Sequence, residues 1–187
     1  MLKVQGEISY SNFHLPIDVS IDKKGIYQII APSGSGKTSF FFVLLGYNDG
    51  FKGQVNVDGD LSISFQNNHL LSHLTVKEQL KYVSDDSDRI EEVLQSLGID
   101  DIFSKRISTL SGGQQRLVNI ARALCKEHDL LLLDEPFAFL DEEKIKIVEN
   151  AVKQFQAKWN TLVLLVSHQS TEMPILKSST IQDKLEL

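Results

Sequence analysis

Short apolar runs alternate along the chain with segments in which apolar residues recur at helical spacing. Residues 17–22 alternate apolar and polar side chains, and a turn at 23–25 leads into the apolar run 26–30, so this region is expected to form strands. The runs 130–133 and 161–166 have the length and composition of strands that are covered on both faces. Because strands alternate with helices, the pattern predicts an α/β protein with a mainly parallel central sheet.

Helices are marked by apolar stripes and by capping residues. Residues 75–78, Thr-Val-Lys-Glu, have the form of a capping box, and Gly98 stands where a helix C-terminus is expected after the stripe at 90–97. Much of the segment 67–117 is helical by these criteria, which predicts a helical insertion in the α/β core. Helical stripes are expected over residues 39–46, 75–83, 90–97, 117–124 and 145–159.

Composition narrows the class of protein. A chain of 187 residues with 42% hydrophobic and 24% charged residues is expected to form one globular domain. Its net charge of −6 repels phosphates, so nucleic acid is not an expected partner. The single cysteine, Cys125, excludes an intrachain disulfide and favours a cytosolic location. No apolar run approaches the roughly 18 to 20 residues that a membrane-spanning helix needs.

Residues 31–38, Ala-Pro-Ser-Gly-Ser-Gly-Lys-Thr, carry phosphate-binding chemistry between a strand and a helix. They match the P-loop pattern except at Ala31, where glycine is usual. Glycines let successive backbone N–H groups point at phosphate oxygens, and the helix N-terminus adds its positive dipole end. Lys37 supplies a charge for the β- and γ-phosphates, and the Thr38 hydroxyl can bind Mg²⁺. The alternative is a glycine-serine turn without a ligand, but the Gly-Lys-Thr ending and its context favour nucleotide binding.

Two acids close the apolar run 130–133. A carboxylate at the carboxyl end of a parallel strand lies where such sheets bind ligands. Asp134 can hold Mg²⁺ through water, and Glu135 can act as a general base towards an attacking water. The competing interpretation is that this pair only opens the turn before Pro136.

Residues 110–116, Leu-Ser-Gly-Gly-Gln-Gln-Arg, form a second candidate anion site. Ser111 and the two glycines precede a predicted helix start, where backbone N–H groups favour an anion. One P-loop together with a separate phosphate-binding helix end indicates that two chains share each nucleotide. The alternative is a serine cap followed by a glycine turn.

The order of these motifs resembles that of ABC-type ATPase domains. The matching motifs are Walker A at 31–38, a Q-loop at Phe65-Gln66, the signature at 110–124, Walker B at 130–135, a D-loop at Phe139-Leu140-Asp141 and a switch histidine at Ser167-His168. The resemblance implies a P-loop NTPase fold with a mainly parallel core sheet, an N-terminal antiparallel β part and an inserted helical subdomain. It implies one ABC ATPase domain over 1–187, with a RecA-like core in 1–66 and 118–187 and the helical subdomain in 67–117.

The resemblance also implies roles for single residues. In this family two domains pack head to tail around ATP and Mg²⁺. The implied catalytic residues are Lys37, Gln66, Glu135 and His168. The implied nucleotide-binding residues are Tyr10, Ser33, Gly34, Ser35, Gly36, Lys37, Thr38 and Ser39, with Phe13 as the alternative to Tyr10 for stacking on adenine. Signature residues that would contact the partner's ATP are Ser111, Gly112, Gly113 and Gln114. Asp141 would cross the interface, and Mg²⁺ would be held by Thr38, Gln66 and, through water, Asp134.

The function implied by the resemblance is that of the ATP-binding and hydrolysing subunit of an ABC transporter on the cytoplasmic face of a membrane. The implied partners are a second ATP-binding subunit, transmembrane permease subunits and, in an importer, a solute-binding protein. Residues 66–76 resemble small-solute importers, including thiamine- and molybdate-type subunits, with exporters and lipoprotein-release relatives as the alternative. Non-transport ABC ATPases of DNA repair or translation, or a regulatory module, form another alternative. The chain departs from the family at Ala31, at Phe139, where a small residue is common, and in its short helical segment.

The remaining histidines have no metal-ligand partners at useful spacing and are expected on the surface or in loops. They are His14, His69, His73 and His128. Cys125 is expected to be a buried small residue on the signature helix.

Overall fold

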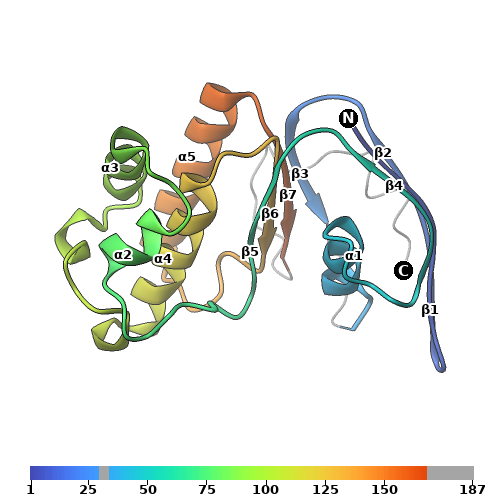
Figure 1. Ribbon diagram of the computed structural model, residues 1–187, viewed down its shortest axis with the longest axis horizontal. Helices are drawn as coiled ribbons and strands as arrows, with labels where there is room; N and C mark the ends of the chain where they lie inside the picture. Colours follow the sequence, from blue (N-terminus) through green and yellow to red (C-terminus); the bar gives the residue numbers. More distant parts are fainter. Residues whose placement is uncertain (30–33, 168–187) are drawn as a thin grey trace.

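The computed structural model describes residues 1–29 and 34–167, and its centre is a parallel sheet (Figure 1). All three neighbouring pairs of this sheet are parallel. In spatial order its strands are β3 (Gly25–Ile29), β7 (Leu162–Val166), β6 (Leu130–Asp134) and β5 (Leu61–Ser64). Every residue of β6 and β7 is buried, as their continuous apolar runs predict.

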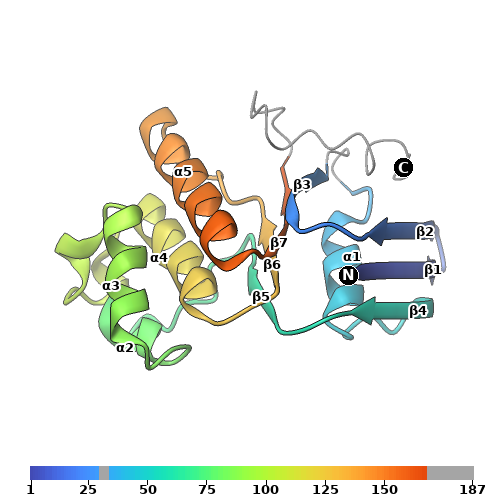
Figure 2. The same ribbon diagram turned by 90° about the horizontal axis from the view of Figure 1, so that it is seen from above.

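A second, antiparallel sheet is built from the N-terminal part of the chain. Its order is β2-β1-β4, with β1 (Leu2–Tyr10), β2 (Phe13–Ile21) and β4 (Phe51–Val57). Apolar residues alternate with polar ones along β2, so that one face of the strand is buried. The helix α1 (Lys37–Leu44) lies between this sheet and the parallel sheet (Figures 1 and 2). Phe40 and Phe41 of α1 belong to the apolar core that joins the two sheets.

The other helices lie on the opposite side of the parallel sheet (Figure 2). They are α2 (Val76–Lys81), α3 (Ser87–Ser96), α4 (Gly112–Cys125) and α5 (Glu142–Trp159), with short 3₁₀ turns at Asp100–Ile102 and Ile107–Thr109. No helix among the described residues has the length and hydropathy of a membrane span.

The helix ends largely follow the sequence signals. Thr75 forms the predicted capping box, and Gly98 has a left-handed φ of 61° after α3. The glycines of the signature, expected just ahead of a helix, instead form the first turn of α4. The reason is that Ser111 and Gln114 form a second capping box, which starts the helix at Gly112.

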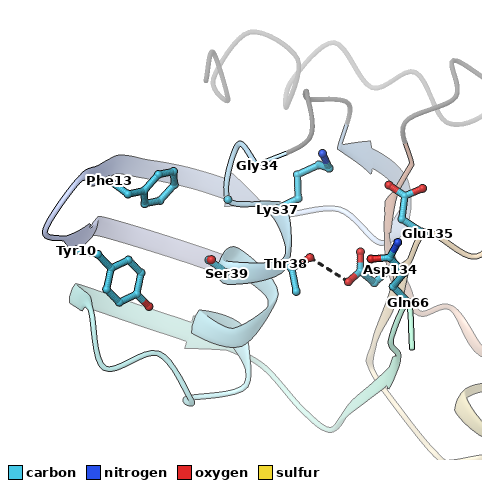
Figure 3. A pocket seen from close by; sticks show the side chains of 10 residues that line it. Tyr10, Phe13, Gly34, Lys37, Thr38, Ser39, Gln66, Asp134 and Glu135 are labelled. Atoms are coloured by element: carbon cyan, nitrogen blue, oxygen red, sulfur yellow. Dashed lines mark hydrogen bonds between the residues drawn. The ribbon is translucent and has the colours of Figure 1, made fainter. Parts of the chain in front are cut away.

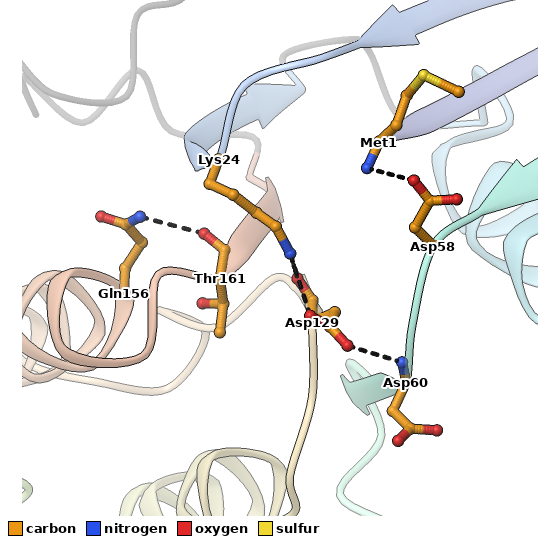
Figure 4. A network of polar contacts seen from close by, with 7 residues as sticks. All are labelled: Met1, Lys24, Asp58, Asp60, Asp129, Gln156 and Thr161. Atoms are coloured by element: carbon orange, nitrogen blue, oxygen red, sulfur yellow. Dashed lines mark hydrogen bonds and ion pairs between the residues drawn. The ribbon is translucent and has the colours of Figure 1, made fainter.

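Asp129 ties together the amino-terminal ends of the parallel strands (Figure 4). Its carboxylate accepts from the Lys24 ammonium at 3.3 Å and from the Asp60 N–H at 3.2 Å, and its carbonyl accepts from the Leu162 N–H at 2.8 Å. The Asp60 N–H, and then Lys24, lower the pKa of Asp129. At Gly59, with φ of 89°, a Cβ would lie 1.9 Å from this carboxylate. These contacts fix the end of the sheet that is opposite the P-loop.

His128 lies in the loop between α4 and β6, as expected, but its ring is half-buried rather than on the surface. The ring packs edge-on against Trp159, with centroids 5.8 Å apart. The Arg89 guanidinium lies 3.8 Å from the Trp159 centroid and donates to the carbonyls of Leu124 and Lys126 at the end of α4. This cluster therefore joins α3, α4 and α5.

Candidate nucleotide-binding site

A cavity of about 450 Å³ opens at the carboxyl ends of the parallel strands. It lies between those strand ends, the N-terminus of α1 and the β1–β2 end of the antiparallel sheet (Figure 3). Its lining contains most of the residues predicted to bind nucleotide and metal. They are Tyr10, Phe13, Gly34, Gly36, Lys37, Thr38, Ser39, Gln66, Asp134 and Glu135.

The described part of the P-loop has the backbone that its glycines predict. Gly34 and Gly36 have φ of 78° and 97°, and Gly36 is the N-cap of α1. A Cβ at Gly36 would come within 2.7 Å of Leu15 and 2.8 Å of Phe13, so packing also requires glycine there. The predicted ligand Ser33 lies outside the described residues, as do 30–32.

Lys37 is the positive charge of this cavity. Its side chain is only 7% exposed and points into the cavity (Figure 3). Burial lowers the pKa of Lys37, while the nearby carboxylates of Glu135 and Asp134 raise it. A cation that is largely removed from water attracts an anion more strongly than an exposed one, because there is less screening. Lys37 can therefore bind a phosphate group in this cavity.

Thr38 and Asp134 provide adjacent hard oxygen ligands. The Thr38 hydroxyl donates to the Asp134 carboxylate at 3.2 Å, and Asp134 is 2% exposed. No group of three or more His, Cys, Asp and Glu side chains gathers anywhere in residues 1–29 and 34–167. The Thr38–Asp134 pair lacks the ligands for a zinc centre but fits Mg²⁺, which takes few protein oxygens together with phosphate and water. Gln66 adds an amide oxygen in the same cavity.

Glu135 enters the cavity from a strained backbone. Its φ of 49° places it in the left-handed region, which costs a non-glycine residue roughly 1–2 kcal/mol. Its N–H donates to the Val166 carbonyl at 2.9 Å, and its own carbonyl accepts from Arg116 at 2.6 Å. The turn aims the carboxylate at the cavity, near Asp134 and Gln66 (Figure 3). This direction suits a group that accepts a proton from water.

Two aromatic residues line the side of the cavity formed by the antiparallel sheet. Tyr10 is 51% exposed, and its hydroxyl donates to the Asn48 side chain at 2.9 Å. Asn48 in turn donates to the Ser39 carbonyl, which anchors Tyr10 to α1. Phe13 packs instead under Gly36. The structure places both rings at the cavity, so both stay candidates for contact with a planar base.

The Ser35 hydroxyl is buried and has no hydrogen-bond partner in the described chain.

The predicted signature and D-loop residues lie together, apart from the residues that line the cavity. Ser111 caps α4, and the backbone carbonyl of Phe139 lies 3.2 Å from where a Cβ at Gly113 would be. Asp141 is the N-cap of α5, and its carboxylate accepts from the Lys144 N–H at 2.9 Å. Phe139 is 83% exposed and has φ of 66°. The predicted catalytic residue His168 lies outside the described residues.

One residue at this site has no role in the sequence prediction. The Arg116 guanidinium donates to backbone carbonyls of two separate chain segments at the cavity, among them those of Gln66 and Glu135. The signal available in the sequence is an arginine that directly precedes the apolar stripe starting at Leu117. That signal is weak, since arginines beside apolar stripes usually point to solvent.

The fold and the cavity define a P-loop NTPase. A model of the ABC transporter family matches residues 15–138. The thiamine import ATP-binding protein ThiQ of Histophilus somni is 30% identical over 192 residues, which cover 92% of this chain and 90% of that protein. The molybdenum import ATP-binding protein ModC of Albidiferax ferrireducens is 32% identical over 203 residues, which cover 96% and 55%. The chain therefore belongs to the ABC transporter family. It is an ATP-binding, ATP-hydrolysing subunit of such a transporter, as the sequence predicts.

Solved structures agree with this fold. The structure of an RNase-L Inhibitor superimposes with a TM-score of 0.80 at 30% sequence identity. The match covers 89% of this chain and 33% of the other, so the chain spans about a third of that protein. The predicted P-loop NTPase fold, with its parallel core sheet, antiparallel β part and helical layer, is confirmed.

Proposed function

We propose that this ATPase works on the cytoplasmic face of a membrane, in a pair of ATP-binding subunits attached to permease subunits, and powers uptake of a small solute. The observation that carries the proposal is the cavity that combines Lys37, the Thr38–Asp134 pair and Glu135. Import is supported by the relatives named for thiamine and molybdenum import. A solute-binding protein is then a third partner, and export is the alternative outcome.

The nucleotide would bind through groups on both sides of the cavity. Backbone N–H groups at the start of α1 and the Lys37 ammonium hold the phosphates, together with the loop residues Ser33, Gly34, Ser35 and Gly36 and with Ser39 of α1. Tyr10 supplies the platform for adenine, with Phe13 as its alternative. Thr38 and Gln66 would hold Mg²⁺, with Asp134 holding it through water. When bound, this ion supplies positive charge to the phosphate oxygens as the terminal phosphate is lost.

Hydrolysis requires one water to be oriented and deprotonated. The water oxygen forms a bond to the γ-phosphorus while the bond from that phosphorus to the bridging oxygen breaks and ADP leaves. Glu135 accepts the water's proton, Gln66 and His168 orient the water, and Lys37 stabilises the charge on the phosphates. The placement of Glu135 and Gln66 on one cavity wall supports these roles.

A second copy or a paralogue would complete the site. Ser111, Gly112, Gly113 and Gln114 form the first turn of α4, whose N–H groups favour an anion that comes from another molecule. Phe139 and Leu140, which precede Asp141, lie against Gly113 of this turn, and Asp141 would cross the interface. We also propose one ABC ATPase domain over 1–187, with the RecA-like core in 1–66 and 118–187 and the helical subdomain in 67–117. The position of α2 and α3 on one side of the sheet supports this division, and α4 spans its boundary.

Two substitutions test the catalytic proposal. Lys37→Ala removes a charge-assisted contact and is expected to weaken ATP binding at least about tenfold in a titration. Glu135→Gln is expected to bind ATP within about twofold of wild type, to lower kcat at least about a hundredfold and to elute as a dimer with ATP. Glu143→Gln, the same change at an exposed residue of α5, serves as the control and keeps kcat. Unchanged ATP binding by Lys37→Ala would overturn the assignment of the cavity.

The transport proposal has its own test. Extraction of the tagged protein from its native membranes in mild detergent is expected to recover multi-span membrane proteins in stoichiometric amounts. Their association should persist in Glu135→Gln, because that substitution leaves the outer surface unchanged. Recovery of the active ATPase without any membrane protein contradicts the transport role and favours a non-transport ATPase.

A further inference from the structure

Arg116 is a charged residue of α4 without solvent exposure. Burial lowers the pKa of its guanidinium to about 10, so the group still carries its charge at neutral pH. Removing such a charge from water costs several kcal/mol unless polar partners replace the water. The surroundings of Arg116 must therefore supply strong acceptors.

The acceptors are five backbone carbonyls from two segments that are far apart in the chain. Nη1 donates to the carbonyls of Phe65 at 2.6 Å and Gln66 at 3.2 Å. Nη2 donates to those of Asp134 at 2.5 Å and Glu135 at 2.6 Å, and Nε donates to Pro136 at 3.3 Å. Because a guanidinium is a rigid planar fork, it fixes all of these carbonyl directions relative to one another.

The two segments carry the side chains proposed to order water for hydrolysis. Gln66 follows β5 and Glu135 follows β6, and both line the cavity. The left-handed backbone of Glu135 needs support, because a residue with a Cβ is strained in that region. Val166 holds the N–H of Glu135 and Arg116 holds its carbonyl, so both neighbouring peptide groups are tied. The direction of the carboxylate depends on these two contacts.

Polar residues continue this contact along one face of α4. Residues three apart lie on the same side of a helix, and Asn119 follows Arg116 by three positions and precedes Arg122 by three. Asn119 donates to the Phe65 carbonyl at 3.0 Å, and Arg122 donates to the His69 carbonyl at 2.9 Å. The segment from 65 to 69 is thereby attached to the same helix that Ser111 caps, and the two are expected to move together.

We propose that Arg116 is a positioning residue for ATP hydrolysis, which holds Gln66 and Glu135 in one arrangement and couples both to the α4 N-terminus. The inference rests on the proposed function, since it takes these two side chains as the groups that order and deprotonate the water. A movement of Ser111 then moves Gln66 and Glu135 together. Binding of ATP without Mg²⁺ does not depend on Arg116, because Lys37 belongs to α1, outside the carbonyl set that Arg116 binds.

The test replaces the planar fork with a point charge. Arg116→Lys keeps the charge but cannot hold five carbonyls, so kcat at saturating ATP is expected to fall at least about tenfold. The dissociation constant of ATP, measured without Mg²⁺, should stay within about twofold of wild type. The matched control is Arg89→Lys on α3, whose guanidinium donates to the carbonyls of Leu124 and Lys126 at the C-terminal end of α4. This control is expected to lower the urea midpoint while keeping kcat within about twofold.

The outcomes separate positioning from a purely structural role. If Arg116→Lys is folded and keeps the wild-type kcat while its urea midpoint falls, as in the control, the proposal is overturned. If Arg116→Lys does not fold, Asn119→Ala decides, because it removes the second bond to the Phe65 carbonyl and leaves Arg116 in place. A kcat lowered about threefold or more with unchanged ATP affinity supports coupling through α4, and an unchanged kcat overturns it.

Failure of the proposed function gives a different result. If Glu135→Gln hydrolyses ATP as fast as wild type, the catalytic assignment itself is wrong, whatever Arg116 does. If Glu135→Gln is inactive while a folded Arg116→Lys is fully active, only the positioning role of Arg116 is wrong.

Discussion

His128 is expected to make the stability of the protein depend on pH. Its Nδ1 lies 2.7 Å from the Lys126 carbonyl and so carries the hydrogen, which leaves Nε2 as the atom that would bind a second proton. Nε2 is buried and has no hydrogen-bond partner in the described chain. Burial is the main reason that the pKa of His128 is lowered from 6.5 to about 4; the charge of Arg89 acts in the same direction, and the Lys126 carbonyl and Asp129 oppose it.

The sign and size of the effect follow from these two pKa values. The unfolded chain binds a proton at His128 near pH 6.5, whereas the folded chain binds it only near pH 4. The folded state is therefore fully stabilised by the neutral ring above about pH 7, and this stabilisation is lost as the pH falls from 6.5 to 4. At about 1.4 kcal/mol per pH unit, the loss amounts to about 3 kcal/mol.

Urea unfolding without nucleotide, followed by tryptophan fluorescence at pH 7.5 and at pH 4.5, measures this loss. The difference between wild type and His128→Phe isolates the histidine, because the carboxylates that also titrate are common to both proteins. Wild type should lose about 2–3 kcal/mol more than the variant over this interval. His73→Asn, which removes an exposed histidine, is the control for substitution of a histidine as such.

Parallel stability curves of wild type and His128→Phe would refute the reasoning. They would mean that water or an acid reaches Nε2 in the folded state, so that its protonation is not penalised. A variant that loses more stability than wild type at low pH would refute it equally, because the sign of the linkage would then be reversed.

Substitutions at three further positions test the geometry of the site. Gly36→Ala should lower the free energy of unfolding by about 1–3 kcal/mol, because the new Cβ would collide with Leu15 at a positive φ. The same change should weaken ATP binding at least about tenfold. Intact ATP binding in a titration would contradict this. Asp141→Ala should lower the urea midpoint of unfolding through loss of the cap on Lys144, whereas Asp141→Asn should retain most of the wild-type stability. Phe139→Gly should raise the free energy of unfolding by about 0.5–1 kcal/mol, since glycine relieves its left-handed backbone; a lowered value would show that the exposed ring packs in the folded state.

Much of the fold follows from local patterns in the sequence. The runs 130–133 and 161–166 supply the fully buried strands β6 and β7, because strands that are covered on both faces carry continuous apolar residues. Thr75 starts its helix as predicted, since capping depends on residues only three positions away. The meeting of Lys37 with Asp134 and Glu135 also follows, because carboxyl ends of parallel strands share one edge.

The remaining features depend on contacts between distant residues. The burial of His128 arises from Trp159, the last residue of α5, and no local pattern in the sequence indicates that contact. Arg116 is a polar residue on an amphipathic helix, which local rules place in solvent. Its partners are backbone carbonyls, and these leave no mark on the identity of the residues that carry them. A site built from side chains is therefore easier to predict than one that is held by the main chain.

The order of strands in the parallel sheet has a consequence for synthesis of the chain. In the described sheet, β3 pairs only with β7, so that Gly25 lies opposite Leu162. The strand that leads into the P-loop thus leaves the ribosome early, but its neighbour emerges only after nearly all of the described chain has been made. Long-range pairing of this kind forms late in folding, because distant segments must first be brought together. A nascent chain is therefore expected to complete its helical layer before it can hold a nucleotide.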